Sequence, residues 1–196
     1  MVLPIVAFGD PILKKVGVDI DKNYPGLSQL IADMYETMYD ASGVGLAAPQ
    51  IGKSVRLFVV DASPFAEDKD DKGKPLEEYK DLKDFKKIFI NAKIVSEKGE
   101  AWKFNEGCLS VPKIREDVLR LPELRIQYLD ENFKRHEETF KGIAARIIQH
   151  EYDHIEGKLF IDRINPLRRK MLKGKLDDIS KGKVDVAYKM KFPTRK

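Results

Sequence analysis

A chain of 196 residues with 42% hydrophobic and 35% charged side chains has the length of one domain of roughly 100–200 residues and is too apolar to be intrinsically disordered. It contains no run of the roughly 18 apolar residues that a membrane-spanning helix needs, and its N-terminal segment lacks the basic start of a signal or transit peptide. The net charge of +4 conceals a basic tail: residues 166–196 hold 11 Lys/Arg and 3 Asp/Glu, giving +8, so residues 1–165 sum to −4.

The first half of the chain predicts a helix, a loop and a strand. Apolar residues at helical spacing after Pro25-Gly26 predict an amphipathic helix over 27–41, with its apolar face packed on a sheet. Residues 43–50 are rich in glycine and predict a loop that leads into a strand at 55–60. Residues 67–87 carry 8 acidic and 7 basic side chains, which predicts a solvated surface insertion without a core of its own.

The second half predicts antiparallel strands followed by a buried helix. Turn sequences separate strand-like segments at 88–95, 118–121, 124–129 and 135–140. Residues 143–157 combine helix formers, helical apolar spacing and a final glycine, which predicts a mostly buried helix. The basic tail can contact nucleic acid or an anionic membrane, but such charge more often forms the solvated face of a terminal helix.

The predicted buried helix contains the motif His150-Glu151-x-x-His154. Side chains four residues apart lie one turn above one another, so the two imidazoles can bind one metal ion while Glu151 reaches toward water on that ion. This geometry is typical of hydrolases. Two core histidines with separate partners would give the same motif, and a catalytic metal also needs a third protein ligand and an open position.

The third ligand could be Cys108, His136 or an acidic side chain. His136 lies in a charged segment that indicates a solvated surface position. Cys108 is favoured, because the neighbouring Gly107 lets a backbone approach closely, although a lone cysteine is often only a small buried side chain. As the only cysteine it excludes an internal disulfide and indicates a reducing compartment, so we expect a cytoplasmic protein.

Three segments together resemble the signature motifs of the peptide deformylase family. In chain order they are Gly43-Val44-Gly45-Leu46-Ala47-Ala48-Pro49-Gln50, Glu106-Gly107-Cys108-Leu109-Ser110 and Gln149-His150-Glu151-Tyr152-Asp153-His154. The resemblance extends from the first helix to about Asp162. It implies an α+β fold in which antiparallel β-sheets surround a central metal-binding helix, with an N-terminal helix and a basic C-terminal helix. The expected organisation is a catalytic domain over 1–165 and a basic C-terminal extension of the same domain over 166–196.

The activity implied by the resemblance is metal-dependent removal of the N-formyl group from the initiator methionine of nascent proteins, with release of formate. The implied metal ligands are Cys108, His150 and His154. The implied ion is Fe(II), for which Ni(II), Co(II) or Zn(II) can substitute. Glu151 would take a proton from water and deliver it to the leaving amine, while the side-chain amide of Gln50 and the backbone N–H of Leu109 would stabilise the oxyanion.

The substrate is then expected to lie extended beside Val44-Gly45 and Gly107, paired backbone to backbone as an added strand. Selectivity would rest on one deep apolar pocket for the methionine side chain. The candidates for this pocket, which fit ordinary core packing equally well, are Val44, Phe104, Ile143 and Ile147. The expected partners are N-formyl-Met peptides of nascent chains and, transiently, the ribosome through the basic tail, with no DNA and no membrane.

Three other classes of protein fit some of these sequence features. A zincin-type endopeptidase shares the helix motif but is expected to take its third ligand from a downstream Glu or His, and no His follows His154. A structural metal site in a binding module needs a closed set of four ligands and gives no role to Glu151 or Gln50. A nucleic-acid-binding protein is suggested by the basic tail alone, without a recognised motif or interleaved aromatic residues.

Overall fold

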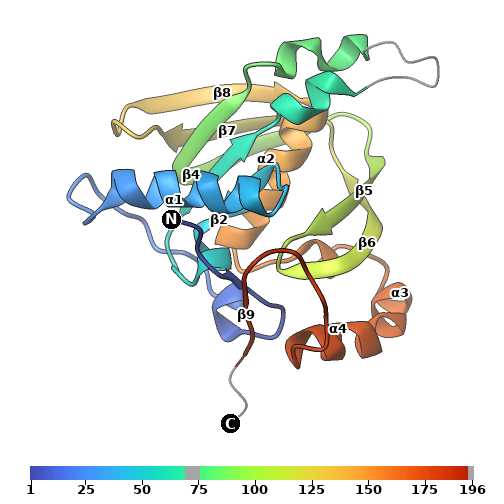
Figure 1. Cartoon of the computed structure of the whole chain (residues 1–196). Coiled ribbons are helices and arrows are strands. Elements are labelled where there is room, and N and C mark those ends of the chain that lie inside the picture. Colours follow the sequence, from blue (N-terminus) through green and yellow to red (C-terminus); the bar gives the residue numbers. More distant parts are fainter. Residues whose placement is uncertain (69–75, 194–196) are drawn as a thin grey trace.

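A computed structural model of the chain describes residues 1–68 and 76–193 and confirms an α+β fold (Figure 1). The α-helices within these ranges are α1 (Leu27–Asp40), α2 (Gly142–Ile155), α3 (Pro166–Met171) and α4 (Lys173–Ser180). The strands are β1 (Ile5–Val6), β2 (Gly45–Ala47), β3 (Leu57–Asp61), β4 (Lys86–Lys98), β5 (Trp102–Cys108), β6 (Val111–Arg120), β7 (Glu123–Leu129), β8 (Arg135–Lys141) and β9 (Met190–Lys191). None of the described helices is long and apolar enough to cross a membrane.

The largest sheet has five antiparallel strands in the order β2-β3-β4-β7-β8. Its strand β3 is buried along its whole length because a helix covers each face. Phe58 and Val60 pack in the cluster that includes the apolar side chains of α2, whereas Leu57 and Val59 pack in the cluster that includes those of α1. Alternate side chains of a strand point to opposite faces, so the continuous apolar run of β3 fits a position between two helices.

Helix α1 confirms the prediction for residues 27–41 to within one residue. Its buried stripe, which includes Leu30, Met34 and Met38, has the helical spacing seen in the sequence. The helix begins after Gly26, whose φ of 69° is a left-handed conformation that glycine adopts without a steric penalty. Burying this stripe against β3 holds one face of the sheet in place.

Helix α2 runs between the five-stranded sheet and the hairpin formed by β5 and β6 (Figure 1). This hairpin is longer than predicted, because only 118–121 had the appearance of a strand. In β6, exposed Lys113 and Arg115 flank buried Ile114, so an alternation of inward and outward residues is present. The sequence did not reveal this alternation, because the inward apolar residues of β6 are interspersed with charged residues.

Two other segments also differ from expectation. Residues 45–47, predicted as part of a loop, form the edge strand β2. Residues 69–75 of the charged insertion lie outside the described residues. In the rest of it, Leu82 is buried and Phe85 packs against the core around α2. These apolar side chains explain why this part of the insertion lies on the domain.

The basic tail is not one terminal helix. It forms the two short helices α3 and α4 and then returns to the N-terminus; Leu172, between the two helices, and Leu176 and Ile179 of α4 are buried. There β9 pairs with β1 in parallel, with Ile5 opposite Met190 and Val6 opposite Lys191. This pairing could not be predicted from the sequence, because strands of two residues are too short to show a period.

Candidate metal centre and active-site cavity

Three potential metal ligands converge on helix α2. One ligand atom from each of Cys108, His150 and His154 lies within 4.8 Å of the others, and the Cys108 Sγ is 3.3 Å from the His154 Nε2. Burial and the charge of His150 hold the pKa of His154 well below its usual range, which favours the neutral imidazole that metals bind. A thiol and two imidazoles suit a borderline divalent cation, so these residues fit the implied metal.

His136 lies away from this group. Its Nε2 is 2.7 Å from the Asp130 Oδ2, and its ring stacks on Tyr128 at a centroid distance of 5.2 Å. Among the described residues, the clustered ligands are Cys108, His150 and His154. The structure thus brings together the same three residues that the sequence motifs indicated.

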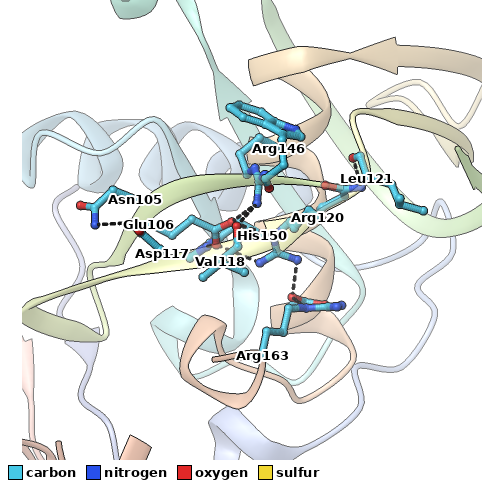
Figure 2. Close-up of polar contacts among 12 residues, drawn as sticks. Asn105, Glu106, Asp117, Val118, Arg120, Leu121, Arg146, His150 and Arg163 are labelled. Carbon is cyan, nitrogen blue, oxygen red and sulfur yellow. Dashed lines mark hydrogen bonds and ion pairs between the residues drawn. The ribbon is translucent and has the colours of Figure 1, made fainter. Parts of the chain in front are cut away.

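The buried carboxylate of Glu106 orients the first histidine of the motif (Figure 2). Its Oε2 is 2.9 Å from the His150 Nδ1, and Arg120 donates to both of its oxygens at 2.7 and 2.9 Å. Arg146 donates to the Oε1 at 2.9 Å. Burial opposes its charge, but the hydrogen bonds from Arg120 and His150 prevail and hold the pKa of Glu106 well below its usual range. A carboxylate on the Nδ1 fixes the ring so that the Nε2 is left for a metal.

Arg120 ties this carboxylate to the motif helix. Its Nη1 donates to the Asp153 Oδ2 at 2.8 Å, and Arg163 also donates to Asp153. Sequence reasoning missed both Glu106 and Arg120 as functional residues. A signal was present for Arg120, because it takes the inward position next to the outward Leu119, which is 54% exposed. A charge at an inward position indicates a buried partner.

Glu151 faces the cavity from the same helix, against strand β2. Its side chain is buried, and its Oε2 has no hydrogen-bond partner among the described residues. Burial raises the pKa of Glu151 to about 7, although the charge of His150 opposes this. At Gly45 an added Cβ would clash with the Glu151 carboxylate, so only glycine fits there while this carboxylate keeps its place.

The amide of Gln50 is fixed by its neighbours. Its Oε1 accepts from the Ala47 N–H at 2.8 Å, which leaves the Nε2 to donate toward the Cys108 Sγ at 3.5 Å and the Ser110 Oγ at 3.4 Å. Leu109 follows Cys108 in the turn between β5 and β6. Both residues line the same cavity as Glu151. Gln50, Leu109 and Glu151 therefore line one cavity together with two of the three potential metal ligands, Cys108 and His150.

That cavity has a volume of about 700 Å³. Of the residues predicted to contact substrate, those that line it are Val44, Gly45, Phe104, Gly107 and Ile147. Ile143 does not, and its place in the predicted pocket is corrected. It lies one turn before Ile147, is 3% exposed and packs in the core beneath the sheet. Residues that the sequence did not indicate also line the cavity, among them Arg146 and the tail segment Asp185, Val186, Ala187 and Tyr188.

Comparison with known proteins agrees with this geometry. A model of the polypeptide deformylase family matches residues 2–170. Peptide deformylases of Christiangramia forsetii and Flavobacterium johnsoniae are each 56% identical to the chain, over 100% of this chain and 98% of theirs. The crystal structure of a peptide deformylase from Legionella pneumophila has a TM-score of 0.75 at 38% identity, covering 93% of this chain and 98% of that one. A structure from Plasmodium falciparum has a TM-score of 0.76 at 34% identity, covering 91% and 95%. The chain therefore belongs to the polypeptide deformylase family, metal-dependent hydrolases that remove the N-formyl group from nascent peptides.

Proposed function

We propose that this chain deformylates nascent peptides with Glu151 as the proton carrier and with Gln50 and Leu109 as oxyanion donors, beside an ion held by Cys108, His150 and His154. The observation that carries the proposal is that Glu151, Gln50 and Leu109 line one cavity together with Cys108 and His150, whose ligand atoms cluster with that of His154. The ion, when bound, supplies a Lewis acid and lowers the pKa of water at the site.

The protein's own residues then account for the proton and charge transfers. The carboxylate of Glu151 accepts the proton of the attacking water and gives it to the leaving amine, a double role that suits a pKa of about 7. The formyl oxygen becomes negative as the water adds. The Gln50 Nε2 and the Leu109 N–H donate to this oxygen, and such fixed donors stabilise the transition state more than the ground state.

The peptide would add as a strand along β2. This strand is the edge of the five-stranded sheet, and an edge strand can pair with an extended peptide while tolerating many side chains. The first side chain would enter the part of the cavity lined by Val44, Phe104 and Ile147, which are apolar. Specificity for methionine would then rest on that pocket alone, with little demand on the residues that follow.

A pair of matched peptides tests the activity. Formyl-Met-Ala-Ser should release formate, whereas acetyl-Met-Ala-Ser should react far more slowly, because its extra methyl group crowds the space beside Leu109. Cleavage of internal peptide bonds at a comparable rate would instead support a zincin-type endopeptidase. A hydroxamate with a methionine-like side chain should inhibit, since its two oxygens can chelate an accessible ion. Absence of inhibition would contradict an open metal position.

We propose Fe(II) as the physiological ion, with Ni(II), Co(II) or Zn(II) as substitutes. A thiolate with two imidazoles accommodates all four ions, so the ligand set supports this choice without selecting it. Metal analysis of anaerobically purified protein, with formate release assayed alongside, identifies the ion. If the ion is Fe(II), activity should decay in air as iron and the thiolate oxidise, and the nickel form should last longer. Equal lifetimes would argue against iron oxidation as the cause.

We also propose a cytoplasmic location and a transient contact of the basic tail with the ribosome. The free thiol of Cys108 suits a reducing compartment, and the excess of +8 over residues 166–196 suits an RNA surface. Deleting the tail is a poor test, because its residues 185–188 line the cavity. Replacing exposed Lys170 and Lys173 by Glu should weaken co-sedimentation with ribosomes in a salt-dependent way and leave activity on a free peptide unchanged. Unaltered co-sedimentation would oppose this contact.

The contact between Gly45 and Glu151 gives a prediction that separates the position of the Glu151 carboxylate from metal binding. In Gly45→Ala the new Cβ must displace the Glu151 carboxylate, and such misplacement is expected to lower kcat by about 10²-fold. Metal content should not change, because Gly45 belongs to neither the ligand set nor its hydrogen-bond partners. Gly174→Ala is the matched control, since a Cβ there meets nothing within 4 Å. Equal kcat in the two variants would show that Glu151 tolerates the displacement.

A further inference from the structure

The turn between β5 and β6 carries both a metal ligand, Cys108, and an oxyanion donor, Leu109. Two segments from outside the hairpin bind its backbone carbonyls. The Phe8 N–H donates to the Ser110 oxygen at 2.8 Å, and the Tyr188 hydroxyl donates to the Leu109 oxygen at 2.8 Å. Successive carbonyls of the turn are thus held by the two ends of the chain, from 102 residues upstream and 79 residues downstream.

The two donors are themselves tied together by the parallel pair β1 and β9. The Ile5 N–H donates to the Lys189 oxygen at 2.8 Å, and the Ala7 N–H donates to the Lys191 oxygen at 2.9 Å. Phe8 directly follows Ala7, and Tyr188 directly precedes Lys189, so each donor adjoins a residue of these two bonds. A shift of either donor therefore has to disturb the pairing of both termini.

Side-chain packing supports the same arrangement. The Tyr188 ring and the Leu109 side chain both pack against the core cluster that contains the apolar face of α1. On the other side, Phe8 and Met190 pack with Cys108 against the cluster beneath α4. The tail also forms a wall of the cavity through residues 185–188. This segment is therefore part of the active site and not only a surface extension.

We propose that Tyr188 is a positioning residue for the deformylation reaction. Its hydroxyl holds the carbonyl of Leu109 and so limits rotation of that residue, which keeps the Leu109 N–H directed at the formyl oxygen. The proposal rests on the oxyanion role of Leu109 proposed above. A donor that is fixed in advance costs no reorganisation during the reaction, so loosening it should affect the transition state more than substrate binding.

The test is Tyr188→Phe, which keeps the ring and removes only the hydroxyl. With formyl-Met-Ala-Ser as substrate, kcat should fall by about five- to tenfold, as expected for one lost hydrogen bond, and KM should stay within about twofold. Metal content should equal that of the wild type. Tyr35→Phe is the matched control, because the Tyr35 hydroxyl donates to a backbone carbonyl, that of Lys87, at 3.0 Å and Tyr35 does not line the cavity. Tyr35→Phe should lower the melting temperature about as much as Tyr188→Phe does and should leave kcat unchanged.

Three results would overturn the proposal: the same kcat in both variants, a change in KM alone, or loss of metal from Tyr188→Phe. Tyr188→Leu removes the ring as well, and a fall in kcat that occurs only in this variant would assign the effect to packing and likewise reject the hydroxyl. The measurement on the wild-type protein distinguishes failure of the proposed function from failure of the role proposed for Tyr188. Absence of formate release from metal-loaded wild type would contradict the proposed function itself, whereas normal release with unaltered Tyr188→Phe kinetics would contradict only the role of Tyr188.

Discussion

Replacing Cys108 by alanine should remove the bound metal ion and with it nearly all formate release. The variant leaves two imidazoles to hold the ion, and the loss of a direct ligand should exceed the 10–100-fold drop in affinity that is typical when only a partner of a ligand is removed. Cys108→Ser should show an intermediate defect, because a neutral hydroxyl is a poor substitute for a thiolate. The measurements are metal content per chain and formate release from a formylated peptide.

Packing has to be separated from ligation in this experiment, because Cys108 also contacts the apolar cluster that contains Val111. Val111→Ala is a matched control: it removes buried apolar volume from the same hairpin and leaves all three ligand side chains unchanged. It should lower the melting temperature, since large-to-small core changes are destabilising, but should keep the metal. Full metal occupancy in Cys108→Ala would mean that Cys108 is a core side chain and that another group completes the site.

The parts of the molecule that could be predicted from sequence are those with local signals. Helix α1 was predicted because its buried stripe repeats at helical spacing, and α2 because it combines that spacing with helix formers. Prediction of the three metal ligands needed more than the spacing of apolar residues. His150 and His154 lie one turn apart on one helix, so their spacing alone placed them together, whereas Cys108 was added by the resemblance of the three motifs and by elimination.

Other features could not be predicted because they depend on distant parts of the chain. The hydrogen bond between Tyr188 and Leu109 joins residues 79 positions apart, and no local pattern in either segment predicts it. Ile143 shows the same limit in a different way. It shares a helical stripe with Ile147, so the sequence grouped them, but the cavity ends at Ile147 and Arg146 and leaves Ile143 under the sheet.

The buried charges around α2 are the part of the site that could not be predicted from the sequence. Arg120 and Arg146 carry charges that are costly to bury without partners, and both donate to Glu106, which also orients His150. Each residue taken singly fits an exposed position of a charged strand or helix. The three side chains are buried together, and a hydrogen-bonded network of this kind fixes geometry that an apolar core would leave free to adjust.

Replacing Glu151 by glutamine should separate the chemistry from metal binding at a single residue. Glutamine keeps the shape and helix propensity of glutamate, so fold and metal content should be unchanged. It cannot accept the proton of the attacking water. General acid–base catalysis is typically worth about 10²–10⁴-fold, or about 3–5 kcal/mol of barrier, and the loss should appear in kcat more than in KM because the group acts in the transition state.

The alternative role for Glu151 is that of a fourth ligand in a closed structural site, and the same variant tests it. If Glu151 binds the ion, Glu151→Gln should lose metal and melting temperature together, because metal affinity then contributes to folding. The geometry favours the catalytic role, since the clustered ligand atoms belong to Cys108, His150 and His154, and Glu151 has a carboxylate oxygen without a partner among the described residues. Metal content, melting temperature and formate release are therefore measured on one preparation. Intact metal with formate release within threefold of the wild type would eliminate Glu151 as the proton carrier, because neither a ligand nor a general base could be lost at so small a cost.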